Sequence, residues 1–106
     1  MKIYNKLVRD EIPKIIEESG KTCEVVVLSK EKYLIELKRK LIEESNELIN
    51  AITRDEIIEE IVDLTEVINM IMCEEKIKLS EIEDKREVKN KEKGNFKKRY
   101  FLKQVD

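Results

Sequence analysis

Two pairs of acidic residues stand where the helical pattern of this sequence predicts apolar side chains. Glu44 and Glu47 form one pair, Glu60 and Asp63 form the other, and each pair has the spacing i, i+3. Residues three apart lie close together on one face of a helix. Carboxylates on helices that pack together repel one another, and a hard divalent cation with oxygen ligands removes that conflict. The spacing therefore predicts one metal site, for Mg²⁺ or Mn²⁺.

Each acidic pair interrupts the apolar stripe of a long amphipathic helix, expected at about Lys30 to Ile52 and about Arg54 to Glu75. The alternating three-and-four spacing of the stripes is typical of one helix face, and Glu44 and Glu60 fill the vacant positions. The stripes consist of Leu34, Leu37, Leu41, Leu48 and Ala51, and of Ile57, Leu64, Val67 and Ile71. Only a tight turn fits between the two helices, so they should run antiparallel and bring their acidic pairs together.

Capping signals mark where the helices begin. Ser29 is the expected N-cap of the first long helix, and Thr53 with Glu56 three residues later forms a capping box for the second. Ser80 opens another box, with Glu83 as its acid. That box predicts a third, highly charged helix at about residues 81–93.

The segment before the long helices is expected to hold one short helix. Asp10 is its expected N-cap, Pro13 is tolerated in its first turn, and Gly20 stops it. Residues 24–28 are β-prone and are predicted to form an extended segment or a small strand. The fold class expected from these elements is an all-α antiparallel helical bundle with a short extended segment at residues 24–28.

Apolar residues of the second long helix extend well beyond one stripe. A helix that is apolar around most of its circumference must be buried on several sides, and one chain of 106 residues offers too few partners. We therefore expect a single domain over residues 1–106 that completes its bundle as a homodimer or homotetramer. The additional apolar residues are Ile58, Ile61, Val62, Ile68, Met70 and Met72.

Composition narrows the class of protein. Basic and acidic side chains number 22 and 24, a balance that does not mark a nucleic-acid binder. No stretch approaches the apolar length that spans a membrane, and the N-terminus carries no signal-peptide pattern. Cys23 and Cys73 stand alone, as reduced packing residues of a cytoplasmic protein.

The residue types that are missing also exclude chemistry. The chain contains no histidine, which rules out a Ser-His-Asp triad, a histidine zinc motif and a histidine general base. Its two glycines form no phosphate-binding loop. Phosphates would therefore have to be bound by a metal and by basic side chains. Basic candidates gather at both ends of the chain: Lys6, Arg9, Lys89, Lys93, Lys97, Lys98 and Arg99.

Those basic residues have two other interpretations. One is an ordinary solvated surface. The other is a nucleic-acid patch, because Tyr100 and Phe101 stand beside the last cations. We do not favour nucleic acid as a partner, since the patch is short and the rest of the chain is acidic.

The acidic motif resembles a known family. Glu43-Glu44-x-x-Glu47 followed by Glu60-x-x-Asp63 on two antiparallel helices resembles the all-α NTP pyrophosphatase superfamily, which includes MazG, the dimeric dUTPases and phosphoribosyl-ATP pyrophosphohydrolase. Residues 4–13 are similar to the opening of a small stand-alone subgroup labelled phosphoribosyl-ATP-pyrophosphohydrolase-like, and residues 93–99 are similar to its ending. The resemblance covers nearly the whole chain.

The resemblance implies specific roles for residues. The implied metal ligands are Glu44, Glu47, Glu60 and Asp63. Glu43 would orient or deprotonate water, and Lys6, Arg9 and Lys93 would lie near the phosphates. The subgroup usually reads Arg-Gly-Gly-Phe where this chain has Lys93-Gly94-Asn95-Phe96. Lysine keeps the charge but lacks the bidentate fork of arginine.

Three functions remain open from the sequence. The first is a magnesium-dependent nucleoside triphosphate pyrophosphohydrolase of the house-cleaning type, which removes surplus or non-standard nucleotides. The second keeps the chemistry but takes phosphoribosyl-ATP, in histidine biosynthesis. The third belongs to another class: a non-catalytic helical dimerisation or adaptor module whose acids pair with Lys and Arg.

Overall fold

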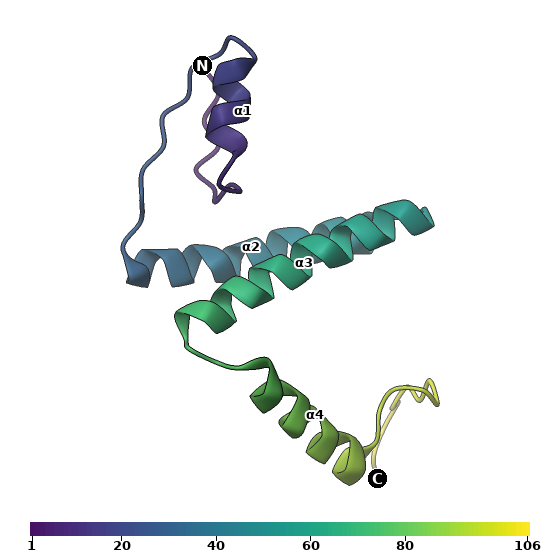
Figure 1. Ribbon diagram of the computed structural model, residues 1–106. Helices are drawn as coiled ribbons and strands as arrows, with labels where there is room; N and C mark the ends of the chain where they lie inside the picture. The colour runs from purple at the N-terminus through teal and green to yellow at the C-terminus, as the bar shows by residue number, and fades with distance from the viewer. The chain divides into compact units, whose positions relative to one another are not determined.

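Helices are the regular elements of the computed structural model, which describes residues 1–106 and contains no β-strand. The prediction of an all-α chain is confirmed. Residues 24–28 form no strand and run irregularly between α1 and α2 (Figure 1), because no second strand is present to pair with their backbone groups. The helices are α1 (Ile12–Glu18), α2 (Lys30–Asn50), α3 (Arg54–Glu74) and α4 (Leu79–Lys93).

Two compact units divide the chain. The first, Met1–Glu75, holds α1, α2 and α3, and the second, Lys76–Asp106, holds α4. No helix in either unit has the length and apolar character needed to cross a membrane. That residues 1–106 act as one functional domain stays a prediction.

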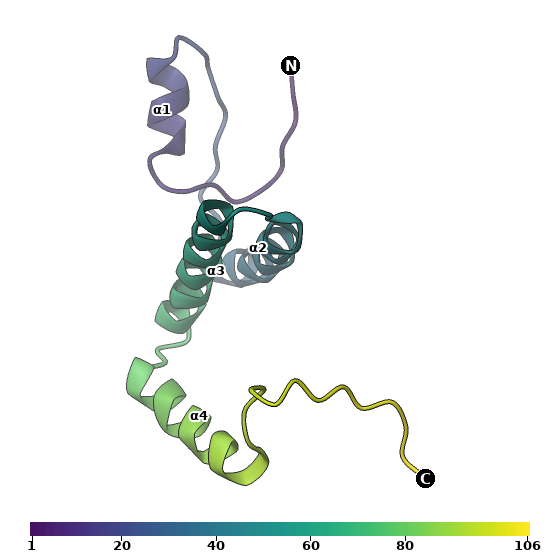
Figure 2. The ribbon, with the colours of Figure 1, turned by 90° about the vertical axis from the view of Figure 1, so that its right-hand side faces the viewer.

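The centre of the first unit is a helical hairpin. α2 and α3 lie side by side and run in opposite directions, joined by the short loop at residues 51–53 (Figures 1 and 2). The Ser29 hydroxyl accepts the Lys32 N–H at 3.3 Å, and the Thr53 hydroxyl accepts the Glu56 N–H at 3.1 Å. Both predicted N-caps are thereby confirmed, and both long helices begin where the sequence predicts.

The hairpin has a thin core. Leu37 is 3% exposed and Val67 is 9% exposed, and no other apolar side chain of the chain is buried. Both belong to the predicted stripes, and the other members of these stripes are half-buried or, for Ile57, 37% exposed. The stripes therefore form the seam between α2 and α3, while much apolar surface stays outside it.

The ends of the shorter helices differ from the prediction. The N-cap of α1 is Glu11 rather than Asp10, and no side chain caps it, because a backbone turn takes that role. In this turn the Ile12 N–H donates to the Arg9 carbonyl at 3.0 Å. Gly20 ends α1 with φ +87°, as its missing Cβ allows.

α4 begins before the predicted Ser80 cap, with Lys78 as its N-cap residue. The Glu81 carboxylate accepts the Lys78 N–H at 2.8 Å, so the acid of the box is Glu81 rather than Glu83. A pattern search for Ser or Thr caps misses this start because the N-cap residue is a lysine.

Candidate metal centre

Three carboxylates converge across the seam of the hairpin. Glu44 comes from α2, Glu60 and Asp63 come from α3, and their nearest oxygens all lie within 4.8 Å of one another. Glu44 is 8% exposed, and it is the one charged residue of the chain that is buried. Sequence periodicity placed Glu44 and Glu60 in the seam, and the antiparallel packing brings them together there.

Glu47, the fourth predicted ligand, lies at the edge of this group. It is exposed and is not one of the three converging carboxylates. Glu47 follows Glu44 by three residues, as Asp63 follows Glu60, but only Asp63 joins the converging group. The negative charge of Glu47 nevertheless contributes to raising the pKa of Glu60, so Glu47 lies close enough to act electrostatically.

The Glu60 carboxylate has an unsatisfied oxygen. Its Oε2 is buried and has no hydrogen-bond partner. Desolvation raises the pKa of Glu60, and so do a hydrogen bond to Glu44 that forms when Glu60 is protonated and the charges of Glu44, Glu47 and Asp63. A buried unpaired carboxylate oxygen is costly, so this atom calls for a proton, a cation or a water molecule as its partner.

The N-terminal segment supplies two cations to the cluster. The Arg9 Nη2 lies 2.8 Å from the Asp63 Oδ1, and the Lys6 Nζ lies 3.5 Å from the Glu43 Oε1. The predicted phosphate contacts Lys6 and Arg9 are thus adjacent to the acids, which sequence spacing alone did not indicate because 37 and 54 residues separate the partners.

Lys40 is a site residue that the sequence analysis missed. Its Nζ lies 3.1 Å from the Glu43 Oε2 and 3.6 Å from the Glu44 Oε1. Burial would raise the pKa of Glu43, but the hydrogen bond and charge of Lys40, together with those of Lys6, lower it overall. The available signal was the position of Lys40, three and four residues before the acids on the same helix.

The charges of the cluster leave room for a divalent cation. Five carboxylates face three cations, which leaves two negative charges. The nearest oxygens of the three carboxylates lie within 4.8 Å of one another, so side-chain rotations would be needed to bring all three onto one ion. The donor set, all oxygen, fits Mg²⁺ or Mn²⁺.

Two hollows lie elsewhere on the surface of the chain. In the first unit an open groove of about 290 Å³, lined by both apolar and polar groups, adjoins the segment that carries Lys6 and Arg9. Burial raises the pKa of Tyr33 in this groove, and the charges of Glu74 and Asp10 add to the shift. The groove is lined by Leu7, Val8, Asp10, Val26, Val27, Leu28 and Tyr33.

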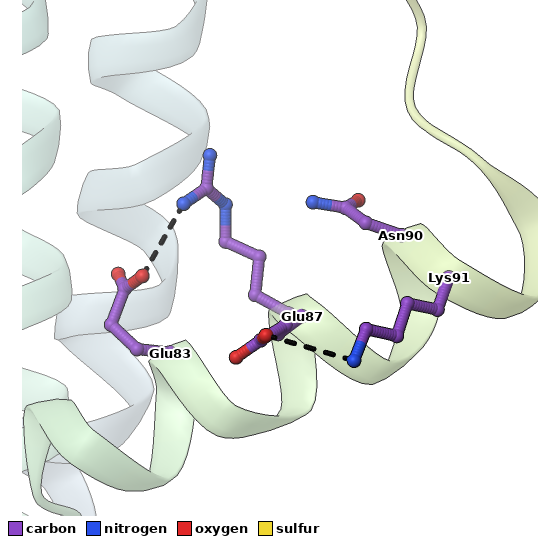
Figure 3. A pocket seen from close by; sticks show the side chains of 5 residues that line it. Glu83, Glu87, Asn90 and Lys91 are labelled. Atoms are coloured by element: carbon purple, nitrogen blue, oxygen red, sulfur yellow. Dashed lines mark hydrogen bonds and ion pairs between the residues drawn. The ribbon is translucent and has the colours of Figure 1, made fainter.

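The second hollow, of about 410 Å³, runs along α4 (Figure 3). All the residues that line it come from this one exposed helix. Glu83 pairs with Arg86 at 3.4 Å and Glu87 pairs with Lys91 at 3.9 Å, as is ordinary for charges three and four residues apart on a helix. We assign no chemistry to this hollow.

Lys93 also lies in the second unit, and its role beside a phosphate stays a prediction.

Comparison of the chain with protein-family models, with curated proteins and with solved structures finds no match.

Proposed function

We propose that this protein is a magnesium-dependent nucleotide pyrophosphohydrolase that releases pyrophosphate from a nucleoside triphosphate. One observation carries the proposal: Glu44, Glu60 and Asp63 converge in a helical seam, where the Glu60 Oε2 is buried without a partner. The resemblance of the two acidic motifs to the all-α NTP pyrophosphatases supports this reaction class. A homodimer or homotetramer in the cytoplasm is part of the proposal.

Glu44, Glu60 and Asp63 would hold the ion, with Glu47 joining them from the edge. Bound Mg²⁺ supplies charge neutralisation for the phosphates and lowers the pKa of a water molecule. Glu43 acts as the general base for the water that attacks the α-phosphorus, because it directly precedes Glu44 on α2 and its carboxylate is ionised at neutral pH. The P–O bond to the β-phosphate breaks, and a nucleoside monophosphate and pyrophosphate leave.

Lys6 and Arg9 bind phosphate oxygens in this proposal. Each is already held against an acid of the cluster, so a phosphate bound to the ion comes within their reach. The open groove that Tyr33 lines accepts the base, because the segment with the two cations also forms one wall of the groove.

A second candidate function has an observation in its favour. Arg9 and Lys40 already pair with three of the acids, as in a structural ion-pair network. In that case the protein would be a helical dimerisation or adaptor module without catalysis. The two candidates differ in whether the acids bind a divalent ion.

The test is pyrophosphate release from a panel of standard and modified nucleoside triphosphates and phosphoribosyl-ATP, with Mg²⁺ and with EDTA. Magnesium-dependent release of pyrophosphate, rather than orthophosphate, supports the reaction class. Activity confined to phosphoribosyl-ATP would assign the protein to histidine biosynthesis. No turnover on any member, with no effect of Mg²⁺ on melting, would support the adaptor function.

A matched pair of variants assigns the activity to the cluster. Glu60→Gln removes the charge at the unpaired oxygen and should abolish metal-dependent turnover while the helices stay intact. Glu59→Gln makes the same change at the preceding, exposed position and should keep full activity. Full activity of Glu60→Gln would refute the assignment of the site.

A further inference from the structure

The open groove of the first unit contains two polar side chains without a partner. Asp10 and Tyr33 both line it, and neither side chain takes part in a hydrogen bond or an ion pair within the chain. Burial raises the pKa of Tyr33, and the charges of Glu74 and Asp10 add to the shift, so the Asp10 carboxylate lies near the phenol. A free acceptor and a free donor therefore stand beside the same groove.

Apolar side chains form the rest of the groove wall. They come from the N-terminal segment and from the segment between α1 and α2: Leu7, Val8, Val26, Val27 and Leu28. Val26 and Val27 are 76% and 100% exposed, and residues 24–28 make no backbone hydrogen bond. This segment packs on little of its own chain, so it offers an apolar surface to a flat ring.

The N-terminal segment joins the groove to the acidic cluster. Lys6 and Arg9 contact acids of the cluster, whereas Leu7, Val8 and Asp10 line the groove. Consecutive Cα atoms are about 3.8 Å apart, so the groove begins one residue away from the cations that are proposed to bind phosphates. A nucleotide whose phosphates lie at the cluster therefore has the groove within reach of its base.

We propose that Asp10 and Tyr33 select guanine as the base of the substrate, an inference that rests on the proposed function. The Watson–Crick edge of guanine presents one acceptor, O6, beside two donors, N1–H and the 2-amino group. An ionised carboxylate accepts two parallel N–H donors, as it does from arginine, and a phenol hydroxyl can donate to O6. Asp10 and Tyr33 together therefore match all three groups of this edge.

The other common bases satisfy fewer of these groups. Adenine and cytosine offer the carboxylate a single amino group. Uracil and thymine offer a single N–H between two carbonyl oxygens, one of which would face the second carboxylate oxygen of Asp10. Hypoxanthine keeps O6 and N1–H and lacks only the 2-amino group of guanine, so comparing these two bases isolates one hydrogen bond to Asp10. A site that hydrogen-bonds a substrate N–H discriminates against an analogue that lacks it.

The first test is isothermal titration of the full chain with guanosine monophosphate and with inosine monophosphate, in the presence of Mg²⁺. Neither nucleotide has an anhydride bond, so binding is measured without turnover. The guanine nucleotide should bind at least about 10-fold more tightly, because the inosine nucleotide lacks one hydrogen bond to a charged group. Equal affinities, or no binding of either nucleotide, would overturn the inference.

Three variants assign the selectivity to its residues. Asp10→Asn replaces one acceptor oxygen by an amide nitrogen, so the ratio of the two affinities should fall to about 1. Tyr33→Phe removes the donor to O6, which both bases carry, so it should weaken both nucleotides equally and keep the ratio. Glu11→Gln neutralises the next acid along the chain, which is exposed and does not line the groove, and it should change neither affinity. A native ratio in Asp10→Asn overturns the role of Asp10.

Turnover of triphosphates separates this inference from the proposed function. Magnesium-dependent release of pyrophosphate at equal kcat/KM from guanosine and inosine triphosphate would keep the hydrolase and overturn the selectivity for guanine. Selective binding of guanosine monophosphate, without turnover of any triphosphate, would support the guanine site and overturn the hydrolase.

Discussion

Glu44→Leu should make the protein more stable and inactive at the same time. Position 44 lies in the seam, 8% exposed, between Leu41 and Leu48 one turn away on either side. Burying a leucine side chain contributes about 1.5–3 kcal/mol, and replacing buried ionic groups by apolar ones commonly stabilises by about 1–4 kcal/mol. Lys40 loses its contact with Glu44 at 3.6 Å but keeps the one with Glu43 at 3.1 Å.

A gain of about 2 kcal/mol raises the Tm of a domain of this size by roughly 8–16 °C. The assay is thermal unfolding followed by circular dichroism, in EDTA and at one protein concentration for all variants, because self-association would also shift the Tm. In the native protein, Mg²⁺ at about 100 times its Kd should add about 2.7 kcal/mol of stability. In Glu44→Leu that increment should vanish, together with pyrophosphate release.

The control is Glu59→Leu, at an exposed position of α3, which should change stability by no more than about 0.5 kcal/mol. A lower Tm of Glu44→Leu in EDTA would refute the reasoning. It would mean that Glu44 stabilises the seam as a structural ion pair with Lys40. A glutamate at position 44 would then not reduce the stability of the metal-free protein.

Three further predictions concern the charges around the cluster. Lys40→Met removes the cation shared by two carboxylates, so the apparent Kd for Mg²⁺ should fall, and kcat should fall as well. Lys38→Met, at an exposed position on the same helix, should change neither quantity. Isothermal titration measures the Kd, and steady-state kinetics measures kcat. Arg9→Ala should raise KM for the nucleotide several-fold without weakening Mg²⁺ binding, whereas an unchanged KM would remove Arg9 from the phosphate site. Without metal, the raised pKa of Glu60 means that protonation of Glu60 stabilises the folded state. This contribution is fully present below the ordinary pKa of 4.5 and is lost as the pH rises through the raised pKa. Mg²⁺ competes with that proton, so the rise in Tm that Mg²⁺ causes should be larger at about pH 8 than at about pH 5, and the opposite trend would contradict a role for Glu60 as a ligand.

The hairpin was predictable because its signals are local. Helix caps such as Ser29 and Thr53 act within four residues, and the stripes repeat within two turns. A charged residue in an apolar stripe is visible in the sequence, and Glu44 and Glu60 were identified on that ground. Apolar residues of α3 outside the seam stripe, such as Ile58 and Ile61, were also visible in the sequence. The structure was needed to show on which side of the hairpin they lie.

Contacts between distant segments were not predictable in the same way. The pairing of Arg9 with Asp63 depends on where the N-terminal segment runs, and hydrophobic periodicity does not predict that path. Residues 24–28 have strand propensity, but a strand needs a partner and the chain supplies none. The shared contact of Lys40 with Glu43 and Glu44 was local, and it was overlooked because a lysine beside acids is ordinary on a helix surface.

The short loop between α2 and α3 also predicts an order in which the cluster assembles during folding. The three converging carboxylates lie within a stretch of 20 residues, Glu44 to Asp63, and closing so short a loop costs little chain entropy. Contacts of this kind belong to the fast, low-contact-order part of a folding reaction. Lys6 and Arg9 must close loops of 37 and 54 residues. We therefore expect the acids of the hairpin to come together before the N-terminal cations arrive to balance their charge. Divalent ions present during refolding would therefore act on the hairpin first and should speed its formation.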